Sequence, residues 1–179
     1  MVVLCVGVPA VVVSAWFVHA TVAAGKGWPT PEGALQAFVG SFDDNTHNGE
    51  MTATEAFMSG REGPALDARR AFLTAKATDE AKHPEITSGR LDIASAPDGA
   101  APESRRVHGD TADLVRYHRV SWGLTSPSMG SPMLDSAALP WRATAQHQSD
   151  GWRLVSVVVP PWCTPRPPVA GTEGYAGCR

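Results

Sequence analysis

The chain has 179 residues, which suits one domain of ordinary size with appendages, because domains cluster at roughly 100 to 150 residues. Apolar residues make up 43% and charged residues 18%, as in a folded globular protein, and the formal net charge is −3 at pH 7. The basic residues are scattered along the chain, so the basic patch typical of nucleic-acid binding is missing. We therefore expect no nucleic-acid partner.

Residues 1–24 contain no Asp, Glu, Lys or Arg. About 20 apolar residues are enough to cross the hydrocarbon layer as a helix, so this stretch predicts a transmembrane anchor. The alternative is a signal peptide that is cleaved after the small residues at 22–24, which would leave a secreted protein. The anchor is favoured because the apolar run is longer than a signal peptide needs and no basic residue precedes it. Arginine outnumbers lysine, which is typical of GC-rich bacterial coding.

Two to three helices are predicted after a linker at residues 25–30. Thr30 can cap the first helix and Pro31 suits its first position. The negative charge of Glu32 is favourable near the positive, N-terminal end of the helix dipole. Apolar residues then recur at helical spacing, at Leu35, Phe38, Val39 and Phe42. A polar turn follows over residues 43–49.

A second helix is predicted over residues 52–59, because Thr52 and Glu55 form a capping-box pattern. A third is predicted from Gly63 to about Ala81, where helical periodicity continues until Pro84 stops it. An irregular loop is the alternative for this third segment.

The periodicity changes to alternation from residue 86 onward. Strands are predicted over residues 86–94 and 111–122, with a Pro/Gly/Ala-rich loop over residues 96–106 between them. Residues 138–159 predict a hairpin, because Asp150-Gly151 forms a favoured tight turn between two apolar runs.

Helices followed by strands predict an α+β domain over residues 31–159, in which a curved antiparallel sheet of four strands packs its apolar face onto the helices. We expect the first helix to lie in the concavity of the sheet. The predicted core is Phe38, Phe42, Leu91, Ile93, Val115, Trp141, Leu154, Val155 and Val157.

Residues 160–179 form a Pro/Gly-rich tail that predicts no regular secondary structure. Cys163 and Cys178 lie 15 positions apart in it, and a disulfide between them would stabilise the fold by about 3 kcal/mol in the chain-entropy model. Because disulfides persist in oxidising compartments, the pairing would place the domain outside the cytoplasm. Two unpaired thiols are the alternative.

Two stretches resemble the nuclear-transport-factor-2-like, or SnoaL-like, superfamily of cone-shaped α+β domains. They are Pro31-Glu-Gly-Ala-Leu-Gln-Ala-Phe-Val39 and Trp141-Arg-Ala-Thr-Ala-Gln-His-Gln-Ser-Asp-Gly-Trp-Arg-Leu-Val-Ser-Val-Val-Val159. The resemblance implies a fold, whereas members of this fold carry unrelated activities. Enzymes of this type work in the mouth of the cone with a carboxylate or histidine base and polar oxyanion donors. Asp92, Tyr117, His118 and Arg119 are the candidates here, although each also fits an outward-facing strand position.

No motif predicts a metal or cofactor. The six histidines lack the spacing of metal ligands, no Gly-rich phosphate loop precedes a helix, and no Gly-x-Ser-x-Gly elbow occurs. Four tryptophans could belong to the core or to a binding surface, at Trp122, Trp141, Trp152 and Trp162.

The function expected is therefore a membrane-anchored extracytoplasmic domain without catalytic activity that binds a protein partner or itself. One anchor followed by such a domain is similar in architecture to inner-membrane assembly subunits of secretion and conjugation machines. The alternative is a SnoaL-like enzyme or small-ligand binder whose pocket lies around Asp92, Tyr117 and His118.

Overall fold

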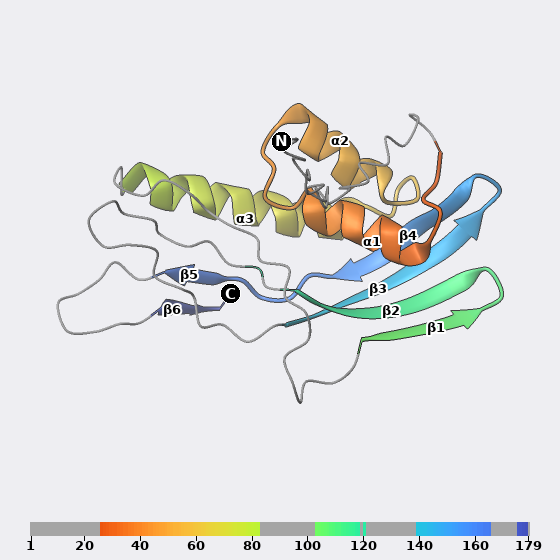
Figure 1. Cartoon of the computed structure of the whole chain (residues 1–179). Coiled ribbons are helices and arrows are strands. Elements are labelled where there is room, and N and C mark those ends of the chain that lie inside the picture. The colour runs from red at the N-terminus through yellow and green to blue at the C-terminus, as the bar shows by residue number, and fades with distance from the viewer. Residues whose placement is uncertain (1–25, 83–102, 119, 121–138, 166–174, 179) are drawn as a thin grey trace, which may run out of the picture.

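The computed structural model describes residues 26–82, 103–118, 120, 139–165 and 175–178. Three helices precede six strands along these residues (Figure 1). They are α1 (Pro31–Gly40), α2 (His47–Glu55), α3 (Gly63–Lys82), β1 (Ser104–His108), β2 (Thr111–His118), β3 (Leu139–Gln148), β4 (Gly151–Val158), β5 (Cys163–Pro165) and β6 (Tyr175–Cys178).

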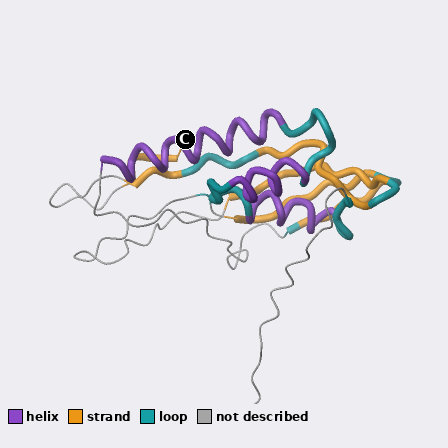
Figure 2. The backbone as a smooth tube through the Cα atoms, turned by 90° about the horizontal axis from the view of Figure 1, so that it is seen from above, coloured by secondary structure: helices purple, strands orange, loops and turns teal. Residues whose placement is uncertain are grey.

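The main sheet has four antiparallel strands in the order β1-β2-β3-β4, and α1 packs against β2, β3 and β4. The predicted α+β class with a four-stranded antiparallel sheet is confirmed, and of the two to three helices predicted the structure has three. Figure 2 shows the helices overlying the strands, with α3 running along the length of the domain.

The sheet has two distinct ends. Both tight turns, at Gly109-Asp110 and Ser149-Asp150, lie at one end, and the amide of His147 donates to the carbonyl of Asp110 at 2.7 Å between them. We call this the turn end. The opposite end, where β2 finishes at His118 and β4 at Val158, is called the far end.

The inner face of the sheet carries the core. Ala112, Leu114 and His118 alternate as buried positions along β2, and β3 contributes Trp141, Ala143 and Ala145. Their neighbours from the helices and from the residues just after α1 and α2 include Leu35, Phe38, Phe42, Phe57 and Phe72. The hydrophobic layer therefore lies between this face and the helices.

Of the predicted core residues, Phe38, Phe42, Trp141 and Leu154 are fully buried, and Val157 packs against the core while half-buried. Leu91 and Ile93 lie outside the described residues.

Two predicted core positions are wrong. Val115 is half-buried on the outer face, opposite Arg142, because it alternates with the buried Leu114. Val155 is half-buried at an irregularity of the β3–β4 register, where Ala145 pairs with Leu154 but Thr144 pairs with Ser156, so the alternation shifts by one residue.

The helix predictions differ in accuracy. The first is confirmed, since the Thr30 hydroxyl accepts from the Gly33 amide at 3.0 Å and Pro31 begins α1. The third helix, α3, also begins at Gly63 as predicted. The second is misplaced, because Thr46 rather than Thr52 is the N-cap and α2 ends at Glu55.

The strand predictions need two corrections. β1 extends over Ser104–His108 and overlaps the predicted loop over residues 96–106, because β2 supplies a pairing partner there. The predicted strand over residues 86–94 lies outside the described residues. The tail was expected to be irregular, yet β5 and β6 pair with each other as an antiparallel ribbon.

The outer edge of β4 is partly covered by chain from elsewhere. Trp28 exchanges two backbone hydrogen bonds with Trp152, at 2.9 and 2.7 Å, and Leu154 is bonded to Ala56 and Met58 at 2.7 and 2.9 Å. Unpaired strand edges invite aggregation, so these contacts protect the part of the β4 edge around Trp152 and Leu154.

Within the described residues, no helix is both long and apolar enough to cross a membrane. Residues 1–25 lie outside that description, so the predicted anchor over residues 1–24 stays a prediction.

Candidate functional site at the far end of the sheet

A row of aromatic rings crosses the domain near the far end. It runs from His118 in β2 to Trp141 in β3, Phe42 after α1, Phe72 in α3 and Trp162 after β4. Successive ring centroids lie 6.1, 5.3, 5.2 and 5.9 Å apart, and three of the four pairs meet edge to face. These separations are those of favourable aromatic pairs. We call these five residues the aromatic row.

Trp141 is the centre of this row. It is fully buried, and it also meets Phe38 with ring centroids 6.2 Å apart. Phe38 in turn packs edge to face on Phe42 and Phe57. The space between sheet and helices at this level is therefore filled by side chains of the chain itself.

His118 lies at the β2 end of the row and is only 5% exposed. Burial lowers the pKa of its imidazole, and Arg116 acts in the same direction while Glu103 opposes it. His118 is therefore held neutral at physiological pH. A neutral imidazole could accept a proton or a hydrogen bond, but it does not present a positive charge.

Three buried nitrogen atoms of the aromatic row have no hydrogen-bond partner. They are His118 Nδ1, Trp141 Nε1 and Trp162 Nε1. An unsatisfied buried polar group costs about 1 to 3 kcal/mol, and most such groups in proteins are paired. The row thus combines tight packing with hydrogen-bonding capacity that the protein leaves unused.

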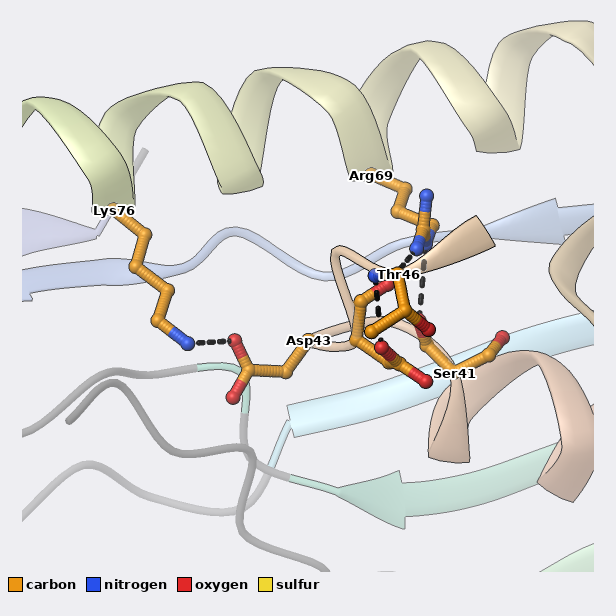
Figure 3. Close-up of polar contacts among 6 residues, drawn as sticks. Ser41, Asp43, Thr46, Arg69 and Lys76 are labelled. Atoms are coloured by element: carbon orange, nitrogen blue, oxygen red, sulfur yellow. Dashed lines mark hydrogen bonds and ion pairs between the residues drawn. The ribbon is translucent and has the colours of Figure 1, made fainter. Parts of the chain in front are cut away.

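An ion pair flanks the row. Lys76 lies one helical turn after Phe72, and its Nζ is 2.5 Å from Asp43 Oδ1, next to Phe42 (Figure 3). The two side chains are only 17% and 21% exposed. Burial raises the pKa of Asp43 more than the hydrogen bond and charge of Lys76 lower it, and the nearby carboxylates of Glu80 and Asp44 add to the rise.

A second cation, Arg69, holds the loop between α1 and α2. It is 3% exposed, and its Nε donates to the carbonyl of Ser41 at 3.0 Å while a terminal nitrogen donates to the carbonyl of Asp44 (Figure 3). Burial lowers the pKa of this guanidinium, which still stays charged at physiological pH. Its partners are carbonyl oxygens, so its role is to position the loop.

The same loop depends on Asp44 and Gly49. Asp44 Oδ1 accepts from the Thr46 amide at 2.9 Å, and this bond lowers the pKa of the Asp44 carboxyl. A Cβ at Gly49 would lie 2.4 Å from the Asp44 carbonyl oxygen, so only glycine fits. These contacts explain why the N-cap of α2 is Thr46, six residues earlier than the predicted cap at Thr52.

The structure separates the site residues predicted from sequence. His118 lies on the inner face of the sheet, whereas its neighbour Tyr117 alternates to the outer face opposite Pro140. Asp92 and Arg119 lie outside the described residues. The inner-face neighbour of His118 along β2 is Arg116, which forms an ion pair with Glu103.

The structural importance of Asp43 and Arg69 was not predicted from the sequence. A signal was present, because Arg69 and Lys76 fall on the same helical stripe as Leu66, Phe72 and Leu73, where a charged residue needs a partner. The partners of both cations lie in the loop after α1. Asp43, the partner of Lys76, lies 33 positions before it in the sequence. A pairing over that sequence separation cannot be recognised from a local sequence pattern.

Metal binding has no assembled site in the part of the chain described. No cluster of three or more His, Cys, Asp or Glu side chains there could hold a metal ion. The described residues do offer a neutral buried histidine, an ion pair and unpaired N–H groups on an aromatic row.

Comparison of the chain with protein-family models, with curated proteins and with solved structures finds no match.

Proposed function

We propose that this protein is a membrane-tethered extracytoplasmic domain that acts by binding a protein partner or a second copy of itself, without catalysis. The observation that carries the proposal is the fully buried Trp141 with the aromatic rings around it. Active and ligand sites are concave, with a few convergent polar groups, whereas this interior is filled by side chains. A filled interior supports a domain that works through its surface.

The proposal includes a cone-shaped fold of the nuclear-transport-factor-2-like superfamily. The order of helices before an antiparallel four-stranded sheet supports it, as does the packing of α1 against β2, β3 and β4. The fold by itself does not select an activity.

The extracytoplasmic location is supported by the backbone of the tail. β5 and β6 run antiparallel with Cys163 directly opposite Cys178. Directly opposed residues in such pairs have Cα atoms roughly 4.5 to 5.5 Å apart, which lies within the range that a disulfide spans. We therefore propose the disulfide that the sequence suggests, with residues 1–24 as the tether.

Mass spectrometry of the full-length protein from membranes tests tether and disulfide together. We expect the intact mass to include residues 1–24 and, without reductant, to be that of the chain less two hydrogens. The variant Cys163→Ser serves as the control and should lose this difference. A mature protein that begins near Gly25 would contradict the tether. Free alkylation of both thiols, at 163 and 178, would contradict the disulfide.

Photo-crosslinking in cells tests the binding function. Val158 is 61% exposed on the last strand of the sheet, so a photoreactive residue there should yield a defined adduct with a protein or with a second copy. A photoreactive residue at the exposed Ala77 of α3 is the control. If no defined adduct distinguishes position 158 from position 77, this sheet face does not bind a partner.

A small-ligand or enzyme function is the second candidate, because of the three unpaired buried nitrogens of the aromatic row. A ligand rich in hydrogen-bond acceptors could satisfy them. Small carboxylic acids that raise the melting temperature of the wild type but not of His118→Leu and Trp141→Phe would support this candidate. Equal shifts in all three proteins would remove it.

A further inference from the structure

The chain enters the folded domain at the turn end, and its entry point is tightly fixed. A Cβ at Gly27 would lie 2.6 Å from the carbonyl carbon of Gly151, and a Cβ at Gly151 would lie 2.6 Å from that of Gly27. The next residue, Trp28, exchanges two backbone hydrogen bonds with Trp152. The position of Gly27 against the β3–β4 turn is therefore set by backbone contact.

The chain between the apolar segment and this fixed point is very short. The segment ends at Ala24, three residues before Gly27. Even fully extended, three residues span no more than about 11 Å. The headgroup layer on each side of a bilayer is roughly 5 to 7 Å thick. A domain tethered in this way cannot stand far from the membrane.

We infer that the turn end, formed by Gly27-Trp28, Gly109-Asp110 and Ser149–Gly151, rests on the headgroup layer of the bilayer and that the far end points away from it. This inference depends on the proposed function, because it requires residues 1–24 to be the tether. It adds the surface that contacts lipid and the orientation of the domain.

The chemistry of the turn end suits headgroups. Its exposed side chains are polar or charged, at Lys26, His108, Asp110, His147, Ser149 and Asp150. Among the described residues, the exposed large apolar ones are Met51, Val107 and Val158. Of these, Val107 lies close to the Gly109-Asp110 turn. The half-buried Trp28 and Trp152 lie at the same end, and tryptophan is enriched at the membrane–water interface. Contact at headgroup depth, without insertion into the hydrocarbon, fits this composition.

The orientation determines what faces away from the membrane. The segment before α3 lies beside β4, since the Met58 amide donates to the carbonyl of Leu154 and the Met58 side chain contacts Gln148 at 3.9 Å. From there α3 runs away from the turn end and past the far end of the sheet (Figures 1 and 2), and its 20 residues span about 30 Å. The aromatic row and the β5–β6 ribbon are thereby presented on the side away from lipid.

Energy transfer from the domain to labelled lipids tests the orientation. The full chain, with Cys5→Ser, is reconstituted in phospholipid nanodiscs whose headgroups carry an acceptor dye. A donor dye is attached under non-reducing conditions to Ser149→Cys at the turn end or to Ala77→Cys in α3; both positions are exposed. Ala77 lies 14 residues into α3, which is about 20 Å along the helix.

We expect transfer from position 149 to be several-fold more efficient than from position 77. As a control, a flexible Gly/Ser linker of about 20 residues between Lys26 and Gly27, with a mean span of roughly 25 Å, should abolish most of the difference. Equal transfer from the two positions without the linker, or stronger transfer from position 77, would overturn the inferred orientation.

Failure of the tether can be told apart from failure of the orientation. If alkaline washing releases the chain from membranes, or if the mature protein lacks residues 1–24, the tether is wrong and the inferred orientation fails with it. If the chain stays in the membrane and both positions give equal transfer, only the orientation is wrong.

Discussion

The two ends of the sheet are stabilised by different means. At the turn end, backbone meets backbone, as Gly27 lies against Gly151 and Trp28 pairs with Trp152. At the far end, side chains from β2, β3, α3 and two connecting segments meet in the aromatic row beside the Asp43–Lys76 ion pair. The turn end therefore tolerates little change in local backbone geometry, whereas the far end depends on side-chain volume and charge.

The largest expected effect belongs to the far end. Trp141→Ala removes a fully buried ring that contacts the rings of Phe38, Phe42 and His118, so it should lower the free energy of unfolding by about 3 to 5 kcal/mol. Urea denaturation measures the change. Trp28→Ala at the turn end should cost less, because Trp28 is half-buried and its backbone bonds to Trp152 remain. An equal or larger loss for Trp28→Ala would break the comparison.

The next effect belongs to the turn end. Gly151 has a φ of +134°, and a Cβ there would lie 2.6 Å from Gly27. Gly151→Ala should therefore cost about 1 to 3 kcal/mol of stability through backbone strain alone. Gly40→Ala is the matched control, since a Cβ at Gly40 meets nothing within 4 Å. Similar melting temperatures for the two variants would contradict the tight contact.

A double-mutant cycle on the ion pair should give a smaller effect. Asp43→Asn and Lys76→Met each leave one partly buried group without its partner and should each cost about 1 kcal/mol. The double variant should lose less than the sum of the two, because no charge is then left unpaired. Strict additivity in chemical denaturation would show that the pair contributes no coupling.

The smallest effect is a pH dependence from His118. Its folded-state pKa lies below the ordinary value of 6.5, so below that pH the unfolded chain binds the proton more readily. Stability should be full above pH 6.5 and should fall as the pH drops from 6.5 through the folded-state pKa. His118→Leu should remove this slope between pH 7.5 and 5. An unchanged slope would mean that His118 is not the group responsible.

Features with local causes were predicted well. The Thr30-Pro31-Glu32 start of α1 and the Asp150-Gly151 turn both act within four residues, so sequence alone locates them. The start of α2 was missed because Thr46 and Thr52 are both plausible caps. The contacts of Arg69 with the carbonyls of Ser41 and Asp44 hold the loop in which Thr46 becomes the cap.

Features with distant causes were missed. All five residues of β1 are exposed, so the strand shows no apolar alternation, and it is recognised only through its pairing with β2. Leu114 and Val115 are equally apolar, and the pairing with Ala143 and Arg142 decides which of them is buried. The candidate site could not be predicted for the same reason, because the residues of the aromatic row come from five separate parts of the chain.

The sequence by itself determined the α+β class, the N-cap of α1, the tight β3–β4 turn and the apolar residues available for a core. These depend on interactions within a few residues of the chain. The tertiary structure alone decided which apolar residues are buried, which cations find carbonyl or carboxylate partners, and where the chain enters the domain against Gly151. Those outcomes depend on contacts between distant segments, which become defined only once the sheet and helices are packed together.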